Sequence, residues 1–180
     1  LDTTSNLEIG IATGYVKVTG SAENEVTSLH GNVRIFGDNG GSCSNDEPYC
    51  QEWSKGFDQI VGGIESGDPD EDGKNEIIIG TGGDDRDGEG AVTGKVYVYH
   101  YTANDYILDG SVINSQRYEP YGIAIGDPDN DGSTEIVVGT KKYEESQPLL
   151  SIYDGDTGHN LKYSRDVSTN SVGGVETVDF

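Results

Sequence analysis

The stretch Gly67-Asp-Pro-Asp-Glu-Asp-Gly-Lys-Asn-Glu-Ile-Ile-Ile-Gly-Thr81 returns in nearly the same form as Gly126-Asp-Pro-Asp-Asn-Asp-Gly-Ser-Thr-Glu-Ile-Val-Val-Gly-Thr140. The two copies are 59 residues apart, and each joins an acidic segment to a short run of β-branched residues. Short apolar runs bounded by glycine are typical of buried strands, here at residues 77–79 and 136–138. The repeat therefore predicts an acidic loop followed by a buried strand, in two copies.

Further strands are predicted around each acidic loop. A Gly-Ile step, at Gly63-Ile64 and again at Gly122-Ile123, predicts the strand that enters each loop. Alternation of apolar and polar residues predicts third strands at 31–36, 94–99 and 149–153. Fourth strands are predicted at 51–56, 106–112 and 161–167. Gly, Asp and Asn gather at 37–41 and 154–158, where they predict chain reversals.

Four short strands in a unit of this length are typical of a propeller blade. The fold class that we predict is all-β, a β-propeller segment of three four-stranded blade-length repeats at 1–59, 60–118 and 119–180. Composition agrees, because Gly is abundant at 27 residues, hydrophobic residues make up only 32%, and no long run has helical spacing. A β-sandwich is the alternative, although it does not require one loop to recur at blade spacing.

The two ends of the chain carry complementary patterns. Val172-Gly-Gly-Val-Glu-Thr-Val-Asp179 copies Val61-Gly-Gly-Ile-Glu-Ser-Gly-Asp68, and Leu7-Glu-Ile-Gly-Ile-Ala-Thr13 resembles the strand that leaves an acidic loop. We expect the C-terminal strand at 172–179 to complete the N-terminal blade of the same or a neighbouring chain. Three blades are fewer than the about four to eight of closed propellers. A fragment of a longer propeller, two chains closing a six-blade ring, and an open head-to-tail filament are the alternatives.

The acidic loops have the residue types and the spacing of a cation site. Alternate acidic residues in a tightly curled loop, with a Glu four positions after the last, can direct carboxylates to one point. A backbone carbonyl at position seven adds a further oxygen. Oxygen ligands without His or Cys favour Ca²⁺ over zinc or copper, and Mg²⁺ demands stricter geometry. Gly73 and Gly132 fit the sharp turn. The sequence thus predicts two Ca²⁺ sites, formed by Asp68, Asp70, Asp72, the Lys74 carbonyl and Glu76, and by Asp127, Asp129, Asp131, the Ser133 carbonyl and Glu135.

An EF-hand shares the start of this pattern but needs a Glu at position 12 and flanking helices. Position 12 is Ile79 or Val138, within a predicted strand. Asp-x-Asp-x-Asp-Gly-x-x-Glu, then Ile-Ile-Ile-Gly or Ile-Val-Val-Gly and Gly-Lys-Val-Tyr-Val-Tyr, instead resembles the FG-GAP repeat of integrin alpha subunits and related microbial propellers. The resemblance extends over about residues 60–180. It implies that each loop binds Ca²⁺ between the first two strands of a blade, through the ligands just named.

Charge and cysteine content bear on partners and compartment. The net charge of −22 argues against nucleic acid and anionic membrane surfaces as partners, and no apolar run is long enough to enter a membrane. Cys43 and Cys50 lie seven apart without the ligands of a zinc site. A local disulfide between them would place the protein outside the cell or on its surface, whereas two free thiols are the alternative. The acidic stretches at 84–89 and 154–158 lack the metal-site spacing and are predicted to be solvated.

No motif predicts catalysis. His30, His100 and His159 are isolated in the sequence, and no Gly-x-Ser-x-Gly segment occurs. Tyr97, Tyr99 and Tyr101 share one strand face, which is typical of packing between blades. We therefore expect a non-catalytic, calcium-stabilised extracellular module for adhesion or for binding a protein or glycan. A self-assembling surface or filament subunit joined through its terminal strands, and a propeller module of a carbohydrate-active protein, are the alternatives.

Overall fold

A computed structural model describes residues 9–19, 26–37, 50–82, 94–102, 105–115, 119–141, 149–167 and 174–176. The regular structure in these residues consists of eleven β-strands, and no helix occurs among them. No helix that could cross a membrane is therefore found in the described part of the chain. The predicted all-β class is confirmed.

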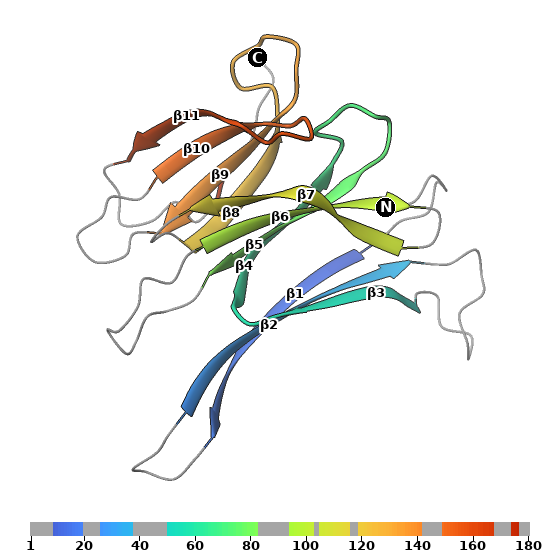
Figure 1. The fold of residues 1–180 in the computed structure, drawn as a ribbon, viewed down its shortest axis with the longest axis vertical. Coiled ribbons are helices and arrows are strands. Elements are labelled where there is room, and N and C mark those ends of the chain that lie inside the picture. Colours follow the sequence, from blue (N-terminus) through green and yellow to red (C-terminus); the bar gives the residue numbers. More distant parts are fainter. Residues whose placement is uncertain are drawn as a thin grey trace.

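The strands form three antiparallel sheets of consecutive strands (Figure 1). Sheet A contains β1 (Ile9–Thr19), β2 (Val26–Gly37) and β3 (Cys50–Phe57). Sheet B contains β4 (Ile60–Gly67), β5 (Glu76–Gly82), β6 (Gly94–Thr102) and β7 (Asp105–Ser115). Sheet C contains β8 (Glu119–Gly126), β9 (Glu135–Lys141), β10 (Leu149–Asp154) and β11 (Leu161–Asp166).

Strand prediction from hydrophobic pattern succeeded in all three sheets. The predicted third strands lie in β2, β6 and β10, and the fourth strands correspond to β3, β7 and β11. Residues 77–79 and 136–138 lie in β5 and β9 and are buried. Each sheet also falls within one of the three predicted repeats. The first repeat differs from the prediction, because its described residues supply three strands rather than four.

Sheet B lies between sheets A and C, with a hydrophobic core on each face (Figure 1). Side chains alternate between the two faces of a strand, so Ile77 and Ile79 of β5 point one way and Ile78 the other. Ile77 and Ile79 pack with Val33 and Ile35 of sheet A. Ile78 packs with residues of sheet C. Strand β5 is buried on both faces, which explains its unbroken run of isoleucine.

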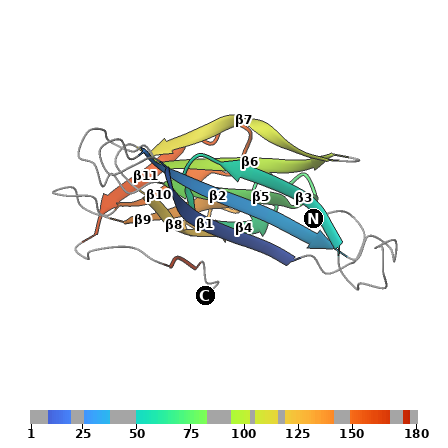
Figure 2. The ribbon, with the colours of Figure 1, turned by 90° about the horizontal axis from the view of Figure 1, so that it is seen from below.

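The first strands of neighbouring sheets approach closely. β4 packs against β8, and β1 packs against β4. Figure 2 shows these strands along one side of the molecule and β7 and β11 along the other. A Cβ added at Gly62 of β4 would lie 2.3 Å from the carbonyl oxygen of Pro120 in β8. Glycine therefore permits a backbone approach between sheets B and C that no other residue would allow.

The predicted tyrosine packing is confirmed. Tyr99 is only 4% exposed, and its ring centroid lies 5.3 Å from that of Trp53 in sheet A. Tyr97 and Tyr101 are partly buried against the same core. Tyr97 and Tyr99 therefore join sheets A and B through ring contacts with Phe57 and Trp53.

Several predictions concern residues that the structure does not describe or places differently. Cys50 begins β3, but Cys43 lies outside the described residues, so the Cys43–Cys50 disulfide stays a prediction. The stretch 84–89 is also outside them. Of the expected strand at 172–179, residues 174–176 are described and form no strand. The described residues do not form a closed ring of sheets.

Candidate metal centre

Three carboxylates converge in the loop between β4 and β5. Asp68 follows the end of β4, Asp70 lies within the loop, and Glu76 begins β5. One carboxylate oxygen from each lies within 4.8 Å of the other two. The loop between β8 and β9 brings Asp127, Asp129 and Glu135 together within the same limit. Both predicted loops therefore hold acidic clusters that could bind a metal ion.

The backbone of each loop curls around its first aspartate. Asp68 Oδ2 accepts a hydrogen bond of 2.9 Å from the N–H of Gly73, and Asp127 Oδ2 accepts one of 2.9 Å from Gly132. Gly73 has φ 86° and Gly132 φ 90°, a left-handed conformation that favours glycine. Each loop thus brings its first aspartate close to the glutamate that begins the next strand.

Burial leaves the glutamate of each cluster incompletely bonded. Glu76 is 3% exposed and Glu135 only 1%. The Oε2 atom of each has no hydrogen-bond partner, and neither has Asp68 Oδ1. An unpaired buried polar atom costs on the order of 1–3 kcal/mol, and more when it is charged. Both loops therefore leave a buried glutamate oxygen without a hydrogen-bond partner at the same position, where a bound cation could satisfy it.

The electrostatics of the first loop indicate the same need for positive charge. Burial first, and then the negative charges of the nearby aspartates, raise the pKa of Glu76 from its ordinary value of 4.5 to about 8; the aspartates are Asp70, Asp72 and Asp68. Burial also raises the pKa of Asp70. A cation bound among these carboxylates would reverse both effects, since opposite charge favours the ionised form.

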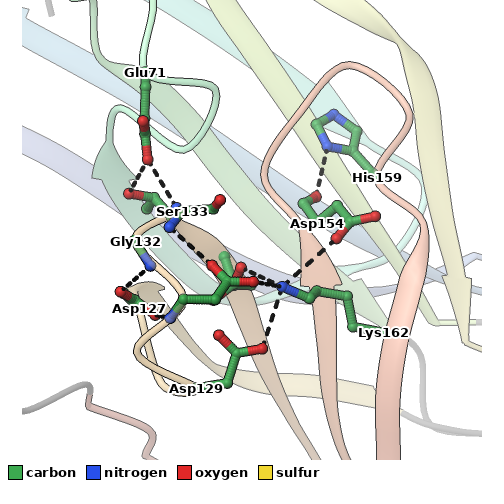
Figure 3. A network of polar contacts seen from close by, with 11 residues as sticks. Glu71, Asp127, Asp129, Gly132, Ser133, Asp154, His159 and Lys162 are labelled. Atoms are coloured by element: carbon green, nitrogen blue, oxygen red, sulfur yellow. Dashed lines mark hydrogen bonds and ion pairs between the residues drawn. The ribbon is translucent and has the colours of Figure 1, made fainter.

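A lysine occupies the corresponding region of the second loop. Lys162 of β11 places its Nζ atom 2.8 Å from Glu135 Oε1, 3.0 Å from Asp131 Oδ2 and 3.3 Å from Asp129 Oδ2. Figure 3 shows the Lys162 side chain reaching across from β11 toward Asp129 and Asp154. Hydrogen bonding to Glu135 and Asp131 raises the pKa of Lys162, so the ammonium stays charged. The second cluster therefore has an internal cation.

Sheet B has an aspartate where sheet C has Lys162. Leu161 pairs with Tyr153 in sheet C, and Leu108 pairs with Tyr99 at the matching register of sheet B. The next residue along the chain is Lys162 in one sheet and Asp109 in the other. Asp109 helps to line an open recess of about 620 Å³ beside Asp70. The first loop thus has an additional negative side chain nearby, and the second has a positive one.

The position-five aspartates lie outside the convergent clusters. Asp72 is bound by the Lys74 ammonium at 2.6 Å, and Asp131 is bound by Lys162. These lysines lower the pKa of both carboxyls. Asp72 and Asp131 also accept hydrogen bonds from the N–H groups of Lys74 and Ser133. Each loop therefore brings together its carboxylates at positions one, three and nine, while the carboxylate at position five stabilises the turn.

The two loops contact each other. Glu71, in the first loop, accepts hydrogen bonds of 2.9 and 3.0 Å from the N–H and the hydroxyl of Thr134. Figure 3 shows Glu71 pointing toward the second loop near Ser133. Thr134 immediately precedes Glu135. Gly155 lies against both loops, since a Cβ added there would come within 2.0 Å of the Pro69 oxygen and 2.4 Å of the Thr134 oxygen. The 154–158 turn is therefore a support for the loops.

Lys162, Glu71 and Gly155 were missed by the sequence interpretation. Lys162 could have been found by aligning Leu161-Lys162 with Leu108-Asp109 in the repeat. The hydrogen bond that Glu71 accepts from Thr134 joins residues 63 positions apart, so the local sequence pattern does not predict it. No protein-family model matches the chain, and no curated protein shows significant similarity to it.

Proposed function

We propose that this protein is a calcium-stabilised, non-catalytic β-propeller module that acts outside the cell or on its surface in adhesion or in binding a protein or glycan. The observation that carries the calcium proposal is the orphaned Glu76 Oε2 atom, buried within a cluster of three carboxylates. The same arrangement at Glu135 supports a second site.

The chemistry of the donors supports calcium over other ions. All of the converging side-chain donors are carboxylate oxygens. Hard oxygen ligands suit Ca²⁺, whose coordination is flexible, whereas Mg²⁺ retains water and demands octahedral geometry. When bound, Ca²⁺ would supply positive charge to the carboxylates and join β4 to β5. The role of the ion in this proposal is structural. Because Ca²⁺ binds the folded chain, it raises the free energy of unfolding by RT ln(1 + [L]/Kd), where [L] is the concentration of free Ca²⁺.

The arrangement of the sheets supports the propeller proposal. Three consecutive antiparallel meanders pack face to face, and β4 and β8, the first strands of sheets B and C, lie along one side of the molecule. Propeller blades are four-stranded meanders repeated around an axis, with their first strands innermost. The acidic loops join the first and second strands of sheets B and C, as the FG-GAP resemblance implies.

The net charge bears on the class of partner, and the contacts of His159 bear on the role of this histidine. The net charge of −22 disfavours polyanionic partners. His159, buried at 6% exposure, lies with its Nε2 atom 3.3 Å from Asp109 Oδ2, and its Nδ1 atom is 3.4 Å from the Asp154 carbonyl oxygen. Its contacts within the fold give it a packing role in this proposal.

Thermal unfolding with excess Ca²⁺, with excess Mg²⁺ and with chelator tests the calcium proposal. We expect Ca²⁺ to raise the Tm clearly above its value in chelator and Mg²⁺ to raise it less. An equal Tm in all three solutions would contradict the proposal that Ca²⁺ stabilises the chain. A separate glycan array with a polysaccharide hydrolysis assay tests the activity class. Release of sugar would contradict a non-catalytic module.

A further inference from the structure

We propose that Glu71 is a positioning residue that couples the two acidic loops, so that a cation bound in the first loop strengthens cation binding in the second. Two sites are coupled when the occupancy of one changes the affinity of the other, and the effect is reciprocal. This coupling rests on the proposed function, because it concerns the same two calcium sites. It adds an energetic connection between them that neither loop has by itself.

Glu71 lies inside the turn that carries the ligands of the first cluster. Its neighbour Asp70 is one of the three convergent carboxylates. Asp70 Oδ1 also accepts a hydrogen bond of 3.2 Å from the N–H of Asp72, and this bond closes the backbone around Glu71. A cation that holds the Asp70 carboxylate in place would therefore also fix the backbone from which the Glu71 side chain extends.

The Glu71 side chain points from the first loop toward the second (Figure 3). One of its oxygens, Oε1, accepts hydrogen bonds of 2.9 Å from the Thr134 N–H and of 3.0 Å from the Thr134 hydroxyl. Hydrogen bonds to an ionised acceptor are about twice as strong as those between neutral groups. Thr134 immediately precedes Glu135, the buried carboxylate of the second cluster. Glu71 thus holds the backbone next to a ligand of the other site.

Thr134 and the first loop also meet at Gly155. The Gly155 N–H donates a hydrogen bond of 3.2 Å to the Thr134 carbonyl oxygen. A Cβ added at Gly155 would lie 2.0 Å from the carbonyl oxygen of Pro69, the residue that separates Asp68 and Asp70 in the first cluster. This glycine therefore contacts both loops and gives a second route from the first cluster to Thr134.

The two loops share one recess of about 340 Å³. Asp70 and Glu71 line the recess from the first loop, and Thr134 and Glu135 line it from the second. A convergent carboxylate of each cluster thus lines the same space. The two candidate sites are neighbours, and a change in the shape of one loop acts on the surroundings of the other.

The sign of the coupling follows from what each cation does to its loop. Without a cation, the carboxylates of the first cluster repel one another. A bound cation removes this repulsion and holds the loop closed, with Glu71 against Thr134. Repulsion between two cations opposes the coupling, but about 0.15 M salt weakens that repulsion. The second cation then binds a loop that is already partly ordered, so it loses less conformational entropy and binds more tightly.

The matching position of the second loop, Asn130, supplies a control variant. Asn130 aligns with Glu71 in the repeat, and its φ of 57° is close to the 59° of Glu71. Alanine at either position therefore meets the same demand on the backbone. Replacement of Asn130 leaves both Glu71 and Thr134 in place, whereas replacement of Glu71 removes the acceptor of both hydrogen bonds.

Calorimetric Ca²⁺ titration tests the coupling through the weaker binding event, which belongs to the second loop because Lys162 competes with the ion there. Glu76→Gln disables the first site, and the event that remains should be at least about fivefold weaker than the weaker event of the unmodified chain. Glu71→Ala should weaken that event by the same factor while the tighter event persists. Glu76→Gln added to Glu71→Ala should then bring no further change.

Two further variants separate the contact from a general loss of structure. Glu71→Gln keeps a side-chain oxygen that can accept hydrogen bonds from Thr134, so the weaker event should still depend on the first site. Asn130→Ala should also keep this dependence. A dependence that is lost in Asn130→Ala, or that survives in Glu71→Ala, would overturn the role of Glu71.

Amide hydrogen exchange of Thr134 gives a readout that a purely structural role of Glu71 would not change. The Thr134 N–H is donated to Glu71 Oε1, so Ca²⁺ at a concentration that fills only the tighter site should slow its exchange at least about fivefold. In Glu71→Ala the same Ca²⁺ should not alter this rate.

The outcomes distinguish the coupling from the calcium proposal. Two independent binding events, a weaker event that Glu76→Gln strengthens, or a Thr134 exchange rate indifferent to Ca²⁺ would overturn the coupling alone and leave the proposed function standing. Absence of Ca²⁺ binding to the unmodified chain would contradict both.

Discussion

Lys162 Nζ lies 2.8 Å from Glu135 Oε1 in the second acidic loop, and Asp109 takes the matching sheet position beside the first loop. Two loops with nearly the same sequence therefore differ in the charge that surrounds them. Desolvation by burial raises the pKa of both glutamates, but hydrogen bonding to Lys162 counters that rise for Glu135. We expect the first loop to bind a divalent cation more tightly than the second.

Replacement of Lys162 tests this difference. Lys162→Gln should raise the Ca²⁺ affinity of the second loop at least about tenfold, equivalent to about 1.4 kcal/mol, because the competing ammonium is gone. Without a cation the variant should be less stable, since Glu135 loses its charged partner while it remains buried. Calorimetric titration and chemical denaturation would measure the two effects.

Lys74→Gln is the control for that experiment. Lys74 also binds an aspartate of an acidic loop, but the side chains of Lys74 and Asp72 are 48% and 41% exposed. Exposed ion pairs contribute about 0–1 kcal/mol. The Lys74 variant should therefore lose little stability, and an equal loss in both variants would contradict the special role of Lys162.

The stability of the metal-free chain should depend on pH through Glu76. The folded state raises the pKa of this carboxyl from 4.5 to about 8. Its contribution to the free energy of unfolding is present in full below pH 4.5 and is lost as the pH rises to about 8, because over this range the unfolded chain releases the Glu76 proton while the folded chain keeps it. Denaturation in chelator should show this decline, and Glu76→Gln should remove its share of it.

Calcium should change the same pH profile. Binding needs the ionised Glu76 carboxylate, so protons compete with the ion and binding releases them. Ca²⁺ affinity should therefore rise with pH up to about 8, the pKa of Glu76. Titration in buffers of different ionisation enthalpy would count the released protons, and an affinity independent of pH would exclude Glu76 as a ligand.

Gly155 should be intolerant of a side chain. A Cβ at this position would overlap the backbone oxygens of Pro69 and Thr134, which belong to the two acidic loops. Gly155→Ala should destabilise the protein by about 1–3 kcal/mol or more, since two loops must shift to admit a methyl group. Gly56→Ala is the control, because a Cβ there meets nothing within 4 Å. Urea denaturation of both variants compares the losses.

The all-β class and the positions of the strands could be predicted from the sequence because their signals are local. Alternation and short β-branched runs located the strands of all three sheets, and the spacing of Asp68, Asp70 and Glu76 located the first cluster. The sequence did not indicate that Asp72 and Asp131 form ion pairs with lysines. Local spacing does not indicate which lysine will contact an aspartate. The position of Lys162 depends on a register shift between β10 and β11.

The contact between the loops was equally inaccessible. Glu71 has φ 59°, an uncommon conformation for a residue other than glycine, and its carboxylate accepts hydrogen bonds from Thr134 of the other acidic loop. Its position depends on the close packing of β4 on β8, which Gly62 permits. Local spacing cannot encode a contact that depends on how two sheets meet.

Calcium titration of the unmodified chain and of Glu76→Gln, by calorimetry in metal-free buffer, tests the central claim most directly. We predict a tighter and a weaker binding event in the unmodified chain, with the tighter event weakened at least about a hundredfold in the variant. Glu65→Gln, which changes a carboxylate outside the cluster, should keep both events. Absence of binding to the unmodified chain, or tight binding that survives Glu76→Gln, would contradict the account.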